Sequence, residues 1–115
     1  MKVAVIGAGG MGGGIAQRRV PEARVVKGWN TISSPVLEDP DFGGEAPSVF
    51  LASDDEEAKG SVGKLARDMG FDPRDCGALS ASSTLERMLT VLGTIGHGLP
   101  LGGWALKVLN REEAS

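Results

Sequence analysis

Short apolar runs alternate along the chain with longer segments in which apolar residues recur every three or four positions. The runs at residues 2–6, 24–29 and 48–52 are rich in β-branched or aromatic side chains, which is typical of strands. Val3 to Ile6 is interpreted as a buried parallel strand. A fourth strand is expected at residues 74–76, and Pro73, which has no N–H to donate, indicates a position at or near the sheet edge.

Helical periodicity is clearest after the third apolar run. A Ser-x-x-Glu sequence at residues 53–56 is typical of a helix start, and the apolar stripe after it is Ala58, Val62, Leu65, Ala66 and Met69, followed by Gly70 as a helix-ending residue. A second Ser-x-x-Glu sequence at residues 83–86 accompanies the stripe Leu85, Met88, Leu89, Leu92 and Ile95. Residues 104–109 are expected to form a last short apolar helix. Residues 33–48 read as a loop with one helical turn at 35–38.

The first strand leads directly into Gly7–Gly12, a complete G-x-G-x-x-G motif that precedes a predicted helix at residues 10–20. In such a motif Gly7 permits a tight turn, Gly9 lets the backbone approach a pyrophosphate, and Gly12 lets the helix pack on the strand. The helix N-terminus favours the anion. We predict a dinucleotide-binding loop; the alternative is a glycine-rich turn without a ligand. The acidic residue expected about 20 positions later is absent, because the second strand ends in Asn30-Thr31.

This order of elements predicts an α/β fold. We expect a three-layer Rossmann-like domain around a small, mostly parallel sheet. Residues 1–115 are interpreted as a single domain, in which residues 1–20 supply the glycine loop and first helix and residues 24–115 supply the remainder.

Composition and charge exclude several classes of function. The net charge of −3 and the lack of a basic cluster argue against a nucleic-acid partner. Cys76 is the sole cysteine, which excludes an internal disulfide and argues against a metal site built on cysteine. No apolar stretch is long enough to span a membrane, so we expect a cytoplasmic protein. His97 lies between glycines and is interpreted as a surface residue, and no catalytic side chain or metal site is predicted.

Several motifs in order make the chain resemble the coenzyme F420-dependent NADP oxidoreductases, dinucleotide-binding reductases that pass hydride between NADP and a deazaflavin. The matching segments are residues 1–16, VVKGWNTI at 25–32, SVFLASDDEEAK at 48–59, GFDPRDCGALS at 70–80, and Leu85-Glu86. Members of the family carry more strands and helices between the first two segments, whereas residues 17–23 join them directly here. The resemblance therefore implies a truncated, internally deleted member that lacks the family's grip on the NADP 2′-phosphate.

The resemblance also implies which residues bind cofactors. Ala8, Gly9, Gly10 and Met11 match the loop positions that meet the pyrophosphate, and together with Gly7 and Gly12 of the motif they make up the expected cofactor-binding loop. Asn30, Thr31 and Ile32 correspond to the segment near the nicotinamide and deazaflavin rings, and Leu79 and Ser80 to a deazaflavin contact. Two alternatives remain open: Thr31 can be a strand-end hydroxyl that satisfies a backbone group, and Leu79 can be an ordinary core residue.

Two functions are therefore expected. The first is an NADP-linked oxidoreductase that transfers hydride between NADP(H) and a deazaflavin-type acceptor, coenzyme F420, with activity impaired by the deletion. The second is a non-catalytic nucleotide-binding module stabilised by dimerisation. An active enzyme would need Arg18, Arg19, Arg24, Lys27 or a second chain to hold the 2′-phosphate. The unpartnered edge of the first strand and the apolar residues of segment 85–109 predict a homodimer through the C-terminal helices.

Overall fold

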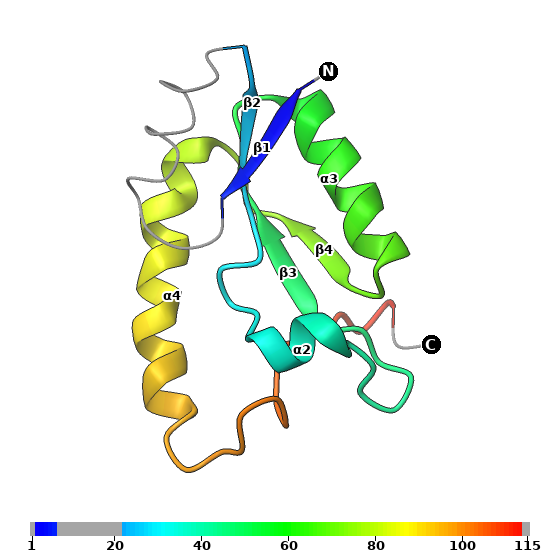
Figure 1. Cartoon of the computed structure of the whole chain (residues 1–115), viewed down its shortest axis with the longest axis vertical. Coiled ribbons are helices and arrows are strands. Elements are labelled where there is room, and N and C mark those ends of the chain that lie inside the picture. Colours follow the sequence, from blue (N-terminus) through cyan, green and yellow to red (C-terminus); the bar gives the residue numbers. More distant parts are fainter. Residues whose placement is uncertain (1, 7–21, 114–115) are drawn as a thin grey trace.

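The computed structural model of the protein describes residues 2–6 and 22–113 (Figure 1). The glycine motif at residues 7–12 and the helix predicted at residues 10–20 lie outside the described residues. From residue 22 onward the chain alternates short strands with helices, as the apolar pattern predicts.

Among the described residues, four short strands form two parallel pairs. Strand β1 (Val3–Ile6) pairs with β2 (Arg24–Lys27), and β3 (Ser48–Leu51) pairs with β4 (Asp72–Asp75). The two pairs are joined at a single antiparallel bridge, where the N–H of Lys27 donates to Ala52 O over 2.8 Å and the N–H of Ala52 donates to Lys27 O over 3.0 Å. The small, mostly parallel sheet that the sequence predicts is therefore confirmed.

Helices lie on both sides of these strands. Helix α3 (Glu56–Asp68) lies on one side and α4 (Ser82–Ile95) on the other, which gives three layers (Figure 1). A short helix α2 (Ser34–Glu38) interrupts the proline-rich segment after β2, and a 3₁₀ turn η1 (Leu79–Ala81) leads into α4. The layer order agrees with the expected α/β class.

The core consists of two small clusters along the sheet. One joins β2 and β3 to α3 through Val26, Leu51, Ala58 and Val62, and the other joins α2 and β3 to the end of α3 through Val36, Val49, Ala66 and Phe71. Trp29 packs against both clusters, and its ring meets Phe71 edge to face at a centroid distance of 6.1 Å. Trp29 therefore connects the two halves of the core.

Strand β1 is less buried than the sequence suggests. Its residues are half-buried, and Val5 is 44% exposed. The physical reason is that β1 is an edge strand: among the described residues it pairs only with β2. Strand β4 likewise has β3 as its sole partner in the described part of the chain and contains Pro73, as the predicted edge position requires.

The predicted helix starts are wrong in detail. Asp55, not Ser53, caps α3: its side chain accepts a 2.9 Å hydrogen bond from the N–H of Ala58. Ser53 is buried, and its hydroxyl donates to Val25 O over 2.7 Å, so it ties β3 to β2 instead. Helix α4 begins at Ser82 after Ala81, and no side chain caps it.

The last predicted helix is also wrong. Residues 104–109 have no regular secondary structure, and Leu106 O accepts a 2.9 Å hydrogen bond from the N–H of Ser48. The N–H of Val108 in turn donates to the Ser48 hydroxyl over 2.9 Å. These two bonds to Ser48 hold residues 106–108 against the start of β3, and this long-range pairing replaces the helical turn that the local apolar pattern suggests.

Candidate functional site

The carboxyl ends of β1 and β2 meet at the point where the glycine motif begins. The N–H of Gly28, just after β2, donates to Ile6 O, the last residue of β1, over 2.9 Å. Ile6 is followed directly by Gly7. In parallel α/β sheets ligands bind at the carboxyl ends of the strands. The junction of Ile6 with Gly28 is therefore the place where a dinucleotide site is expected.

Gly28 has no room for a side chain. A Cβ built on it would lie 2.7 Å from Leu51 Cδ2 and 4.0 Å from Val5 Cγ1. The absence of a side chain lets the end of β2 come close to both β1 and β3. This close approach sets the position from which the turn at Trp29 and Asn30 starts.

Trp29 has an unusual backbone conformation. Its φ is +56°, in the left-handed region that costs a bulky residue about 1–3 kcal/mol. The turn is closed by the N–H of Ile32, which donates to Trp29 O over 3.2 Å. The packing of the Trp29 ring against both core clusters holds this conformation, and the turn directs the chain from β2 into Asn30 and Thr31.

Three consecutive residues at this turn carry buried polar atoms without a partner in the described part of the chain. These atoms are Trp29 Nε1, Asn30 Oδ1 and Thr31 Oγ1. Asn30 is 8% exposed, and its Nδ2 donates to Leu85 O in α4 over 2.8 Å. Buried polar groups in native proteins are nearly always hydrogen-bonded to protein or to ordered water, so these three atoms are the candidates at this turn for contact with a water or a ligand.

Lys27 is the most enclosed charged residue among those described. Its side chain is 0% exposed and forms an ion pair with Glu86 of α4, with Nζ 3.3 Å from Oε1. The apolar pattern alone gives no sign that this strand lysine is buried. The sequence connects Lys27 with the site only as a candidate cation for the 2′-phosphate, one residue before Gly28.

The predicted residues do not all come together. Asn30 contacts α4, and Ile32 packs on the second core cluster. Leu79 and Ser80 lie in η1, where the N–H of Leu79 donates to Asp54 Oδ1 over 3.0 Å. Leu79 lines a pocket at the opposite, amino end of β2. Leu79 is six residues before Leu85, which at helical rise corresponds to roughly 9–12 Å. Within one chain, Leu79 and Ser80 are thus not adjacent to Asn30 and its neighbours.

The basic residues expected to hold the 2′-phosphate are already engaged where they are described. Arg24 pairs with Asp55 at 3.1 Å and with Glu57 at 3.2 Å, and Lys27 pairs with Glu86. Arg18 and Arg19 lie outside the described residues. Of the basic residues that could select NADP over NAD, the two in β2 are therefore both already paired with acidic side chains.

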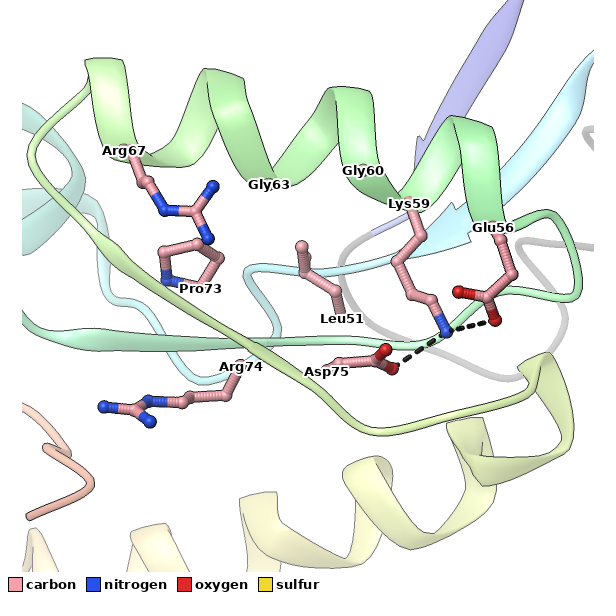
Figure 2. A pocket seen from close by; sticks show the side chains of 9 residues that line it. All are labelled: Leu51, Glu56, Lys59, Gly60, Gly63, Arg67, Pro73, Arg74 and Asp75. Carbon is pink, nitrogen blue, oxygen red and sulfur yellow. Dashed lines mark ion pairs between the residues drawn. The ribbon is translucent and has the colours of Figure 1, made fainter. Parts of the chain in front are cut away.

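A separate groove lies between α3 and β4, on the side of the sheet that α3 covers (Figure 2). It encloses about 170 Å³ and exists because Gly60 and Gly63 of α3 have no side chains. At one end Lys59 Nζ lies 2.8 Å from Asp75 Oδ1 and 3.1 Å from Glu56 Oε1. The hydrogen bond to Asp75 raises the pKa of Lys59 despite its burial. The groove contains none of the predicted site residues.

The remaining chemistry-bearing residues lie apart from the turn. Cys76 follows β4, and burial raises the pKa of its thiol. His97 is exposed beyond α4. Within residues 2–6 and 22–113, no three His, Cys, Asp or Glu side chains are grouped so as to hold a metal ion. No helix in the same part of the chain is long and apolar enough to cross a membrane.

Comparisons with known proteins agree with the family suggested by the sequence. No family model matches the chain. A crystal structure assigned as an F420-dependent NADP reductase from Arthrobacter sp. FB24 superposes with a TM-score of 0.70 and 31% identity, covering 85% of this chain and 45% of that one. A hypothetical protein from Sinorhizobium meliloti superposes with a TM-score of 0.55 and 39% identity over 61% of this chain and 35% of its own.

Curated relatives are also reductases by name. Metalloreductase STEAP2 from Mus musculus is 34% identical over 80 residues, which cover 68% of this chain and 16% of that protein. Metalloreductase STEAP3 from Rattus norvegicus is 38% identical over 66 residues, which cover 57% of this chain and 13% of its own length. The chain thus spans less than a fifth of these relatives. Its resemblance to the F420-dependent NADP reductases and its Rossmann-like α/β fold are confirmed.

Proposed function

We propose that this chain binds NADP(H) at the carboxyl ends of β1 and β2 and acts as an NADP-linked oxidoreductase with a deazaflavin-type acceptor. The observation that carries the proposal is the junction of Ile6 with Gly28. It leads on one side into the glycine motif and on the other into a turn with unpartnered buried polar atoms. Similarity to a protein assigned as an F420-dependent NADP reductase supports the choice of cofactor and acceptor.

Each group of residues has a distinct task in this proposal. The loop residues that hold the pyrophosphate are Gly7, Ala8, Gly9, Gly10, Met11 and Gly12. Asn30, Thr31 and Ile32 flank the rings, and Leu79 and Ser80 contribute to the acceptor side. Hydride transfer is chemistry that the nicotinamide and deazaflavin supply when bound. The chain's own residues orient the rings and exclude water, and this work needs no protein nucleophile.

A homodimer is part of the proposal. The large apolar side chains that remain exposed on α4 and the segment after it are Val91, Ile95, Leu99, Leu101, Val108 and Leu109. This number of exposed apolar side chains in one part of the sequence favours an association site. Pairing through these side chains would also let Leu79 and Ser80 of one chain approach the glycine loop of the other. In the dimer, Leu79 and Ser80 would then contribute to the partner's site, although they lie apart from Asn30 of their own chain.

The alternative is a non-catalytic nucleotide-binding module that dimerisation stabilises. One observation favours it: Arg24 and Lys27, the two basic residues of β2, are both held in ion pairs, so β2 offers the 2′-phosphate no dedicated cation. Under this alternative the chain would bind NADPH and NADH with similar affinity and transfer no hydride.

A transfer assay separates the two functions. NADPH and the oxidised deazaflavin are mixed with the protein, and the absorbance of each is followed, with a ferric chelate as acceptor in a parallel arm because the curated relatives are metalloreductases by name. The proposal predicts coupled loss of the NADPH and deazaflavin bands. Binding of NADPH without loss of either band would favour the non-catalytic module. Reduction of the ferric chelate alone would show that the acceptor is ferric iron and not the deazaflavin.

A further inference from the structure

Two contacts connect the end of β2 and the turn after it with the start of α4, and on the helix they involve adjacent residues. Lys27 Nζ lies 3.3 Å from Glu86 Oε1, and Asn30 Nδ2 donates to Leu85 O over 2.8 Å. Because Leu85 and Glu86 are adjacent on the same helix, a contact that holds the position of one residue also restrains the other. The two contacts therefore act as one connection between strand and helix.

This connection determines which way the Asn30 amide faces. An asparagine side chain has an NH₂ donor and an oxygen acceptor on opposite sides of one flat group. Since the NH₂ donates to Leu85 O, a reversed amide would place its oxygen against a carbonyl oxygen. Asn30 Oδ1 is thus left as an acceptor, and it is buried with no partner among the described residues.

Lys27 is one of the groups that hold Leu85 O in place. No side chain caps the first turn of α4. The turn is held against β2 by the burial of Leu85, by the Asn30 bond itself and by the Lys27–Glu86 pair. Lys27 is fully enclosed, and an enclosed ammonium requires its counter-charge. Glu86 therefore cannot move away from β2 without a penalty, and Leu85 is held with it.

We propose that Lys27 is a positioning residue. Through Glu86 and Leu85 it orients the Asn30 amide so that Oδ1 accepts an N–H from the amide group of a ligand. The inference rests on the proposed function, which brings two ligands with such an N–H to this turn. One is the carboxamide of nicotinamide, and the other is the imide of the deazaflavin pyrimidine ring. The same acceptor suits either donor.

The test compares each ligand with an analogue that lacks the donor. NADP⁺ is compared with its 3-acetylpyridine analogue, and the deazaflavin with its N3-methyl derivative, by measuring Kd for each. One hydrogen bond predicts a preference of about tenfold for the donor-bearing ligand in one of the two pairs. Lys27→Met and Glu86→Ala should reduce this preference to about twofold, since the amide is then free to turn.

Lys59→Met is the matched control. Lys59 is also nearly buried and ion-paired, with Asp75 and Glu56, but it lies in the groove between α3 and β4. The same chemical change there should leave the preference at the wild-type value. Glu86→Ala leaves the enclosed Lys27 without its counter-charge, so it should be less stable than Lys27→Met. Should either single variant fail to fold, the double variant Lys27→Met/Glu86→Ala carries the test, because it removes both charges.

The outcomes separate the inference from the proposed function. If the wild type binds neither NADP⁺ nor the deazaflavin, both the proposed function and the inference are contradicted. If it binds them with no preference in either pair, the acceptor belongs to a buried water and the inference alone is overturned. A wild-type preference that survives Lys27→Met and Glu86→Ala, with both variants folded, shows that Lys27 does not position Asn30.

Discussion

Replacing Gly28 with alanine perturbs the junction on which the site depends. The new Cβ would lie 2.7 Å from Leu51 Cδ2, well inside the contact distance of two carbon atoms. Leu51 is 2% exposed and packs with Val26 and Val62, so its movement disturbs the first core cluster. Either Leu51 or the backbone of residue 28 must shift.

The magnitude depends on where Leu51 can go. Its other methyl, Cδ1, lies 3.8 Å from the place of a Cβ on Gly63 and borders the groove of Figure 2. This space allows a partial shift, which puts Gly28→Ala in the lower part of the usual range for overpacking, about 1–2 kcal/mol. For a domain of this size we expect Tm to fall by roughly 4–8 °C for each kcal/mol lost.

A double-mutant cycle measured by urea unfolding tests this reasoning. Leu51→Ala alone should cost about 2–4 kcal/mol through lost burial. In that background Gly28→Ala should cost less than about 0.5 kcal/mol, because the clashing methyl is gone, which gives a coupling energy of about 1–2 kcal/mol. Gly60→Ala is the control: a Cβ there meets nothing within 4 Å, and alanine favours the helix. Additive effects of Gly28→Ala and Leu51→Ala would refute the proposed clash.

Three further changes have direct expectations. Ser53→Ala should lower the unfolding free energy by about 1–3 kcal/mol in urea titrations, because the buried Ser53–Val25 bond is lost. Burial raises the pKa of Asp72, but hydrogen bonds from Arg74, Ser48 and Lys107 outweigh it, and the net pKa is below the ordinary 3.8. A depressed pKa means that this stabilisation is present above about pH 4 and disappears as the pH falls through the folded-state value. Asp72→Asn should therefore flatten the acid decline of Tm, and an unchanged decline would contradict it. Ile95→Lys, on the exposed apolar face of α4, should give a folded monomer of 11.9 kDa in sedimentation equilibrium where the wild type gives a dimer, and a monomeric wild type would exclude the dimer.

The apolar pattern predicts the elements whose signals are local. Strands β1 to β3 follow from short β-branched runs, and α3 from the recurrence of Ala58, Val62 and Ala66, all three of which are buried. The pattern fails where a distant partner decides the outcome. Ser53 resembles a helix cap, but its hydroxyl is taken by Val25 across the sheet. Residues 104–109 carry a helix-like apolar pattern, yet they form no regular structure, and Leu106 O instead accepts the N–H of Ser48 in β3.

The candidate site is only partly readable from the sequence. Asn30 follows from the resemblance, and the structure adds that α4 supplies its partner through a contact 55 residues away in the chain. The sequence offers Lys27 only as a cation for the phosphate, because a lysine in a strand carries no signal of burial. Its enclosure depends on Glu86 lying opposite, and that depends on how the helix packs on the sheet. The glycine-motif residues stay predictions.

Titration of the protein with NADPH tests the central claim most directly. We predict saturable binding to the wild type, with a weak preference for NADPH over NADH. We also predict a loss of at least about 2 kcal/mol, roughly thirtyfold in Kd, in Gly9→Val, because a side chain then stands where the pyrophosphate approaches. Gly60→Ala, on the opposite side of β3 and β4 from α4, should bind as the wild type does. A wild type that does not bind NADPH, or a Gly9→Val variant that binds it equally well, would contradict the proposed nucleotide site.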